Sequence, residues 1–320
     1  RADDAPALLD EVTNLVEQPT ALLGSCGVAA SRPFNDFPLL AKFIDASDVL
    51  SIQVHPDDDG AAPLHQRGKT EAWYILAAEP GAELITGVRP GVTPSHTHRA
   101  IADGMFDRLV ERRTVTAGDC LMVPAGAVHA IGAGILLYEI QETCDITFRL
   151  YDWNRRDPSG QGRPLHVSEA LRAMKVDRHA TPVAPLALDA HRTVLAACRY
   201  FALERWMVSG TLSLPSTRGR TFRLLSCIEG DAQLQVPGRP SVALARGRTA
   251  LLPADVASAA ITAEAAGVLS VIVPDLSEDI VEPLKHAGYH ADQIARLDGG
   301  IGDIAAVLAA DGPTPITPPA

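Results

Sequence analysis

The chain has few basic residues for its length, and this shortage excludes one class of partner. Its 320 residues include 28 Lys and Arg against 39 Asp and Glu, which gives a formal net charge of −11. A nucleic-acid-binding surface needs a basic face to hold the phosphate backbone, so we expect no nucleic-acid partner. A small anionic substrate is not excluded, because a few local cations can hold one phosphate within a screening length of roughly 10 Å.

Paired cysteines, long apolar runs and a signal peptide are also missing. The five cysteines are scattered, odd in number and without a C-x-x-C pair, which is typical of a cytoplasmic protein rather than of a disulfide framework. The richest apolar stretch, residues 250–274, is interrupted by Asp255 and Glu264, so we expect no membrane span and no membrane partner. The chain opens on Arg1 in a polar segment, which indicates an incomplete N-terminus rather than a signal peptide.

Short strand-like runs, separated by Gly and Pro, make up most of the chain. Gly118 is followed six residues later by Pro124, and the same spacing returns at Gly247 and Pro253, with an apolar run inside each pair. Regularly spaced short strands with such turns are typical of a jelly roll, and a repeated block indicates two of them. The sequence therefore predicts an all-β fold of two tandem jelly rolls with a few peripheral helices.

Changes in composition and in the spacing of apolar residues divide the chain into five predicted segments. The N-terminal segment, residues 1–36, is expected to be helical, because apolar residues within 5–18 recur at helical spacing. A short helical insertion is predicted over residues 93–111. The remaining segments are a first jelly roll at 37–157, a polar, Pro-rich linker at 158–193, a second jelly roll at 194–275 and a helical tail at 276–320.

Five polar residues of the first block are spaced so that they can converge. Gln53 and His55 alternate along one strand and share a face, where two inward polar side chains cost stability unless they find partners. Lys69 and Glu71 share a face of the next strand in the same way. His129 follows a tight turn. Together they predict a polar centre inside the first jelly roll.

The spacing of these residues is that of the cupins. The second cupin motif places a Gly, a P-x-G turn and a His in fixed order, and it is matched by Gly118, Pro124, Gly126 and His129. The first motif reads H-x-H followed by Glu, and Gln53 replaces its first His. Two imidazoles, one carboxylate and one amide oxygen form a mixed nitrogen and oxygen set that suits zinc and leaves a position open for substrate. We therefore expect two cupin jelly rolls, the first of which binds metal.

Longer segments resemble one cupin family, the class I mannose-6-phosphate isomerases of the short bacterial type. The resemblance is continuous over residues 37–157 and weaker over 200–273. It is carried by residues 37–45, 50–58, 68–74, 123–132 and 139–153.

The resemblance implies an enzyme, its cofactor and its site residues. Such an enzyme is a zinc-dependent aldose–ketose isomerase that interconverts mannose 6-phosphate and fructose 6-phosphate through an enediolate, with the small sugar phosphate as its partner. One zinc per chain would be bound by Gln53, His55, Glu71 and His129. Arg149 would be the catalytic arginine and Lys69 would lie beside the metal, as one candidate for the base. Lys42 and Ser51 would bind substrate near its phosphate.

Two other regions are expected to hold no metal. His96 and His98 form a further H-x-H, but no Glu follows at strand spacing, so both are predicted to be solvated. In the second jelly roll, Asp255 and Ser258 take the places that Gly126 and His129 have in the first. Good ligands cannot be assembled there, so this block is predicted to be a scaffold without metal.

Two alternative functions remain open from the sequence. An iron dioxygenase could use a facial set of two His and one carboxylate without Gln53. A non-catalytic sugar-phosphate-binding bicupin could keep the site without turning substrate over. Lys69 and Arg149 favour the isomerase over both.

Overall fold

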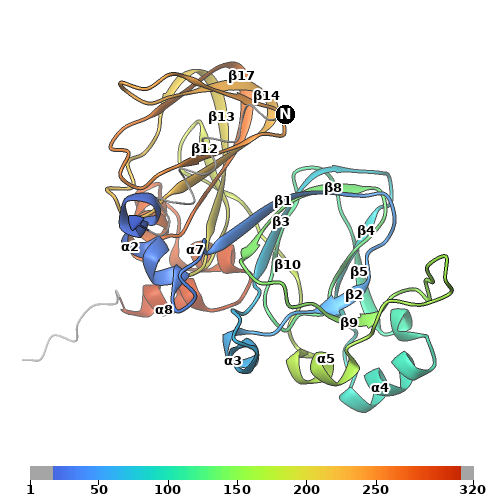
Figure 1. Ribbon diagram of the computed structural model, residues 1–320. Coiled ribbons are helices and arrows are strands. Elements are labelled where there is room, and N and C mark those ends of the chain that lie inside the picture. The colour runs from blue at the N-terminus through green and yellow to red at the C-terminus, as the bar shows by residue number, and fades with distance from the viewer. Residues whose placement is uncertain (1–16, 311–320) are drawn as a thin grey trace, which may run out of the picture. The chain divides into compact units, whose positions relative to one another are not determined.

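The computed structural model describes residues 17–310 and divides into two compact units. One unit runs from Asp36 to Val183 and is called the central unit here. The other joins the residues up to Asn35 with those from Ala184 onward and is called the flanking unit. Both units consist mostly of β-strands, and helices are minor (Figure 1).

Three sheets form the central unit. The five-stranded sheet has the order β1-β8-β3-β6-β10, the three-stranded sheet the order β5-β4-β7, and β2 pairs with β9. All pairs are antiparallel. The strands are β1 Leu39–Ala46, β2 Ile52–Val54, β3 Glu71–Ala78, β4 Glu83–Val88, β5 Val110–Thr114, β6 Cys120–Val123, β7 Ala130–Ile131, β8 Ile135–Glu142, β9 Phe148–Tyr151 and β10 Thr181–Pro182.

The flanking unit is one antiparallel sheet with the order β11-β12-β13-β17-β14-β15, and β16 also pairs with β14. Its apolar core includes Trp206, Leu225 and Val268, each fully buried. The strands are β11 Leu186–Ala187, β12 Arg192–Ala197, β13 Ala202–Ser213, β14 Arg223–Gln235, β15 Val242–Ala245, β16 Thr249–Leu252 and β17 Ala260–Ile272.

The helices are short. They are α2 Pro19–Ser31, α3 Asp58–Ala61, α4 Pro94–Ala102, α5 Val167–Ala173, α6 Glu282–His286, α7 Ala291–Ala295 and α8 Asp303–Ala310, with 3-10 turns at Ala62–Leu64, Phe106–Arg108 and Arg296–Asp298 and a π-helix at Leu276–Val281. Among the described residues, none of them is long and apolar enough to cross a membrane.

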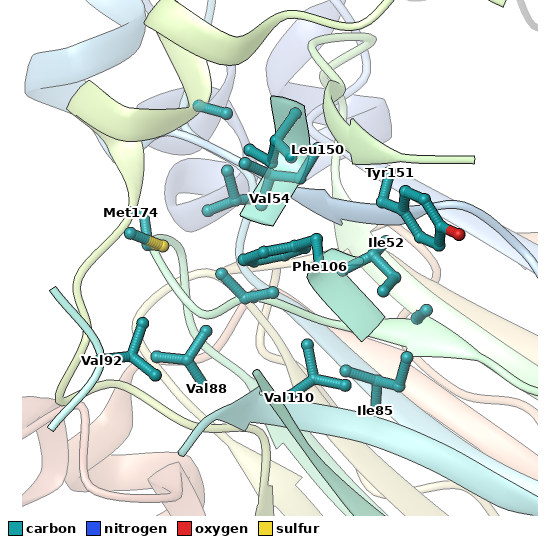
Figure 2. Close-up of a cluster of buried hydrophobic side chains, with 14 residues drawn as sticks. Ile52, Val54, Ile85, Val88, Val92, Phe106, Val110, Leu150, Tyr151 and Met174 are labelled. Carbon is teal, nitrogen blue, oxygen red and sulfur yellow. The ribbon is translucent and has the colours of Figure 1, made fainter. Parts of the chain in front are cut away.

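Two apolar clusters hold the central unit together. In one, Trp73 and Leu121 of the five-stranded sheet meet Leu84 and Ile131 of the three-stranded sheet, so these sheets pack face to face. The other is centred on Phe106 and attaches helices α4 and α5 to strands β2 and β9 (Figures 1 and 2). Because α4 and α5 cover the apolar side of this strand pair, its polar residues are left to face the site.

The repeated turn of the sequence has the same conformation in both units. Gly118 has φ +95° and Gly247 has φ +80°, a region that L side chains rarely adopt. Strand β6 follows the first glycine and β16 follows the second, each beginning two residues on and ending just before a Pro. The predicted match between the two blocks is therefore confirmed at this turn and strand.

The N-terminal half of the chain differs in detail from expectation. The helix predicted over residues 5–18 lies outside the described residues except at its last two positions. Within the segment 1–36 that was expected to be helical, the structure has helix α2, whose bounds were not predicted. The helical insertion is confirmed by α4 and the turn at Phe106–Arg108. The segment expected to be a linker, 158–193, contributes α5 and β10 to the central unit, which extends to Val183.

Candidate metal and substrate site

Three sheets of the central unit supply the residues of the site. Gln53 lies on β2, Glu71 begins β3, and His129 directly precedes β7. Two backbone hydrogen bonds join Gln53 and His129: each amide nitrogen donates to the other residue's carbonyl oxygen, at 3.0 and 2.9 Å. The amide of Gly126 donates to the carbonyl of His55 at 2.8 Å, which places the motif turn beside that strand. The backbone thus fixes where these side chains begin.

The two imidazoles are oriented by backbone carbonyls. Nδ1 of His55 donates to the carbonyl of Ile146 at 2.8 Å, and Nδ1 of His129 donates to that of Ala127 at 3.0 Å. With the proton on Nδ1, each Nε2 keeps its lone pair. Nε2 of His55 lies 3.4 Å from the ammonium of Lys69, and Nε2 of His129 lies 3.4 Å from the amide nitrogen of Gln53. Burial lowers the pKa of both rings, although Glu71 opposes it, so both are neutral and able to ligate at neutral pH.

Glu71 is a buried carboxylate with one oxygen, Oε2, that lacks a hydrogen-bond partner. His55, Glu71 and His129 are each 1% exposed, and their ligand atoms all lie within 4.8 Å of one another. Oε2 of Glu71 is buried without a hydrogen-bond partner, and Nε2 of His129 is 3.7 Å away. Oε1 lies 2.9 Å from the ammonium of Lys69 and 3.5 Å from Nε2 of His55. Burial alone would raise the pKa of Glu71, but Lys69 and the two imidazoles lower it to about 2, so the group is charged. Two nitrogen lone pairs facing a charged carboxylate form a set that fits a divalent metal.

Gln53 reaches the same place with its amide. Its Nε2 lies 3.4 Å from Nε2 of His129, and its Oε1 accepts from the hydroxyl of Ser51 at 3.4 Å. The amide nitrogen, not the oxygen, therefore faces the imidazole. A half-turn of the amide would bring the oxygen there, since oxygen and nitrogen exchange places in such a flip.

Arg149 and Ser51 are brought together, at one side of this cluster. Nε of Arg149 donates to Oγ of Ser51 at 3.3 Å, and Nη1 donates to the carbonyl of Pro164 at 3.0 Å. Ser51 is 4% exposed and Arg149 is half-buried. Strand β9 begins at Phe148, so Arg149 is its second residue. No carboxylate of the described chain pairs with this guanidinium, so it is available to a substrate anion.

Lys42 lies in a different group, which includes two residues that were not predicted for the site. Its ammonium donates to Oε1 of Glu139 at 2.8 Å and to the amide oxygen of Gln141. Glu139 also accepts from Nε1 of Trp73 at 3.1 Å. Burial and the charge of Glu71 raise the pKa of Glu139, while Lys42 opposes them. No hydrogen bond within the described residues joins Lys42 to Ser51, so the two predicted phosphate ligands lie in separate groups.

A signal for Glu139 and Gln141 was present in the sequence. They alternate on one face of an apolar strand, as Gln53 and His55 do. The discounted pair, His96 and His98, lies on α4 with both side chains exposed, as expected.

Two family models match this chain. The catalytic domain of phosphomannose isomerase type I matches residues 12–87, so the matched region begins before residue 37, where the resemblance in sequence began. The mannose-6-phosphate isomerase cupin domain matches residues 191–272, in the flanking unit.

Similar proteins carry the same name. Mannose-6-phosphate isomerases of Bacillus subtilis and Streptococcus mutans are 38% and 36% identical to the chain, over 68% of its length and 69% and 68% of theirs. The crystal structure of the Bacillus subtilis mannose 6-phosphate isomerase superimposes with a TM-score of 0.70, at 28% identity, over 82% of this chain and 81% of that one. With more than two thirds of such relatives covered at this identity, the chain belongs to the mannose-6-phosphate isomerase family, type I.

Proposed function

We propose that the protein is a zinc-dependent aldose–ketose isomerase that interconverts mannose 6-phosphate and fructose 6-phosphate through an enediolate. The observation that carries this proposal is the charged, buried carboxylate of Glu71, which lacks a hydrogen-bond partner at Oε2 and faces the Nε2 lone pairs of two imidazoles. Lys69 meets only the other oxygen, Oε1, and a buried carboxylate oxygen without a partner is costly, so Oε2 is left for a metal ion. Family membership supplies the substrate, since the relatives are named for mannose 6-phosphate.

The metal would be held by Gln53, His55, Glu71 and His129, one ion per chain. Two nitrogen and two oxygen donors favour zinc. When bound, the ion supplies Lewis-acid polarisation of the sugar oxygens. For Gln53 to contribute, its amide turns so that the oxygen replaces the nitrogen beside His129.

Lys69 acts as a protonated group beside the reacting carbons. Burial would lower its pKa, but Glu71 and Glu139 outweigh burial and raise it. An ammonium cannot accept a proton, so in this state Lys69 stabilises negative charge on the sugar and donates a proton. It becomes a base only if a bound metal cancels the charge of Glu71. Glu139, whose pKa is raised, is the second candidate for proton transfer.

Arg149 stabilises the enediolate charge, and Lys42 and Ser51 bind substrate. The guanidinium has five donors in a fixed plane and meets only neutral acceptors, so it can turn toward an anion. The ammonium of Lys42 is half-exposed and already neutralised in part by Glu139. We therefore assign Arg149 the larger electrostatic effect.

The same proposal covers the fold of the protein, its domain boundaries and its cellular compartment. We infer two tandem cupin jelly rolls with a metal centre only in the first, at 37–157, and a scaffold at 194–275. The N-terminal segment 1–36, the connecting segment 158–193, whose part up to Val183 packs with the central unit, and the tail 276–320 complete this division. All five cysteines are free thiols, which supports a cytoplasmic location.

A coupled assay on mannose 6-phosphate tests the proposal, with metal analysis of the same sample. We expect turnover that is lost on chelation and restored by about one equivalent of zinc. Oxygen uptake that depends on iron, without isomerase turnover, would identify the dioxygenase instead. Binding of mannose 6-phosphate without turnover in the zinc-loaded protein would identify the sugar-phosphate sensor.

A further inference from the structure

A recess in the flanking unit contains a buried arginine. The recess is small, with about 10 Å³ of room for a water-sized molecule, and Arg223 lies in its lining with Ser216 and Ser258. Arg223 is 5% exposed, whereas both serines are exposed at the mouth. A cation is thus placed at the inner end of a polar opening.

The guanidinium of Arg223 touches only neutral groups. Nη1 donates to Oγ of Ser270 at 2.6 Å, Nη2 donates to the carbonyl of Pro215 at 3.3 Å, and the plane lies 5.0 Å from the ring of Trp206. Nε is buried without a hydrogen-bond partner. Within residues 17–310, no carboxylate lies at ion-pair distance. Glu204 acts on it only from farther away and accepts a hydrogen bond from Trp206.

Such a cation is expensive unless an anion joins it. Moving a charge out of water costs several kcal/mol, and neutral hydrogen bonds return only part of that. Burial accordingly lowers the pKa of Arg223. The free Nε–H is one donor left for an incoming acceptor.

The strand register shows which position Arg223 holds. In the central unit, Glu71 lies opposite Val123, the last residue of β6. In the flanking unit, Arg223 lies opposite Leu252, the last residue of β16. Because β6 and β16 follow matching glycine turns, Arg223 occupies the position of Glu71.

At a second pair of equivalent positions, the charge of the side chain is also reversed between the two units. Lys42 lies opposite Glu139 in the central unit, and Glu204 lies opposite Ser270 in the flanking unit. The negative residue at the Glu71 position has become positive, and the positive residue at the Lys42 position has become negative. The same backbone thus carries inverted charges, and a cation, Arg223, stands where the cation site has its carboxylate.

We propose that this recess binds a small oxyanion, a carboxylate or a single phosphoryl or sulfate group, on Arg223. Arg223, Ser216 and Ser258 line the recess and are the donors assigned to the anion. The Nε–H of Arg223 is covered, so the guanidinium turns slightly to meet the anion, while the two exposed hydroxyls donate at the mouth. The recess has room for about one water-sized atom, so one oxygen of the anion enters it, whether the anion is free or the end of a larger molecule. The proposal uses no residue of the candidate metal site, so it can be tested independently of the proposed isomerase activity.

Selenate provides a direct test, because selenium can be located by its anomalous scattering. Crystals of the full-length protein soaked in selenate should show a peak within hydrogen-bond distance of Arg223. Competing soaks with acetate and with glycerol 3-phosphate then identify the preferred ligand. Displacement of selenate by acetate indicates a carboxylate, and displacement by glycerol 3-phosphate indicates a phosphate monoester. A recess that holds only water at every concentration tried would overturn the proposal.

Matched variants extend the test to solution. Arg223→Met removes the charge and should weaken selenate binding at that site by about tenfold or more, measured by calorimetry at constant ionic strength. Arg223→Lys keeps the charge but loses the planar guanidinium, so this variant should bind selenate with intermediate affinity. It also provides a test if the Arg223→Met variant fails to fold. Arg239→Met, at an exposed arginine of the same unit, is the control and should leave binding unchanged. Equal selenate affinity in all four proteins would refute the assignment.

Discussion

The metal cluster depends most on His129, because this residue joins the motif turn to β7 and faces Glu71. We predict that His129→Ala removes the metal while the fold largely survives, since the ring is held by a side-chain contact and the strands pair through their backbone. Metal content by elemental analysis and the melting temperature check this. His98→Ala, at an exposed histidine, should keep the metal. One equivalent of zinc retained by the His129 variant would remove this residue from the ligand set.

Arg149 is predicted to act on turnover rather than on folding. Arg149→Lys keeps the charge but loses the planar fork, so we expect turnover to fall roughly 100-fold or more, with metal content and melting temperature little changed. Arg156→Lys, at an exposed arginine nearby, serves as the control. If both Arg149→Lys and Arg149→Ala turned over normally, Arg149 would be structural, and Arg155 would be tested next.

Glu142 is a buried carboxyl group outside the cluster, and its environment makes stability depend on pH. Burial raises its pKa well above 4.5, although the amide of Thr70, which donates to Oε1 at 2.9 Å, opposes this. Between the unfolded and folded pKa values, the folded state holds the extra proton. Stability from this group is therefore full below the unfolded pKa and declines as pH rises toward the folded one.

Glu142→Gln should cancel that decline, because the amide imitates the protonated acid and keeps the oxygen that accepts from Thr70. We expect the variant to exceed the parent in unfolding free energy by about 1 kcal/mol or more at pH 8 and to match it near pH 4. Denaturant titrations at both pH values measure this, with the exposed Glu79→Gln as control. A constant difference at the two pH values would contradict the assignment.

At the scale of single elements, helix α2 depends on one glycine. Gly24 interrupts the helix with φ +73°, and an added Cβ would lie 2.3 Å from the carbonyl carbon of Arg220. That backbone is fixed, since the amide of Cys26 donates to the Arg220 carbonyl at 2.8 Å. We predict that Gly24→Ala lowers the unfolding free energy by about 3 kcal/mol, from the unfavourable φ and the collision together.

Gly238→Ala separates these two causes. Gly238 has φ +76° in the same unit, but nothing lies within 4 Å of its added Cβ. This variant should lose only about 1 kcal/mol in the same denaturant experiment. Equal losses in the two variants would mean that the close approach to Arg220 has no energetic effect.

The elements that the sequence predicted well are those set by local pattern. Apolar runs between turns located most strands, and the glycine at position 118 requires a conformation that few other residues adopt. The bounds of helix α2, within the segment expected to be helical, were missed because Gly24 breaks its apolar spacing. The pairing of Lys42 with Glu139 was also missed, because the two residues are 97 positions apart and only the register of β1 against β8 brings them together.

For the whole molecule, the composition of the two units predicts the metal content. Among the described residues, only one group of three or more His, Cys, Asp or Glu side chains converges closely enough to hold an ion, and it lies in the central unit. We therefore expect one tightly bound metal per chain after dialysis, measured by elemental analysis against protein concentration. A second tightly held ion that survives His129→Ala would place a metal in the flanking unit and contradict the scaffold assignment.

The backbone carbonyls that hold Nδ1 of His55 and His129 also bear on how quickly the protein can take up its ion. Both rings are aimed before any metal arrives, and their orienting bonds come from main chain rather than from mobile side chains. Little conformational entropy is left to lose at the moment of capture. Loading of the chelator-stripped protein should therefore follow a single second-order phase that scales with free metal concentration, without a slow rearrangement after it.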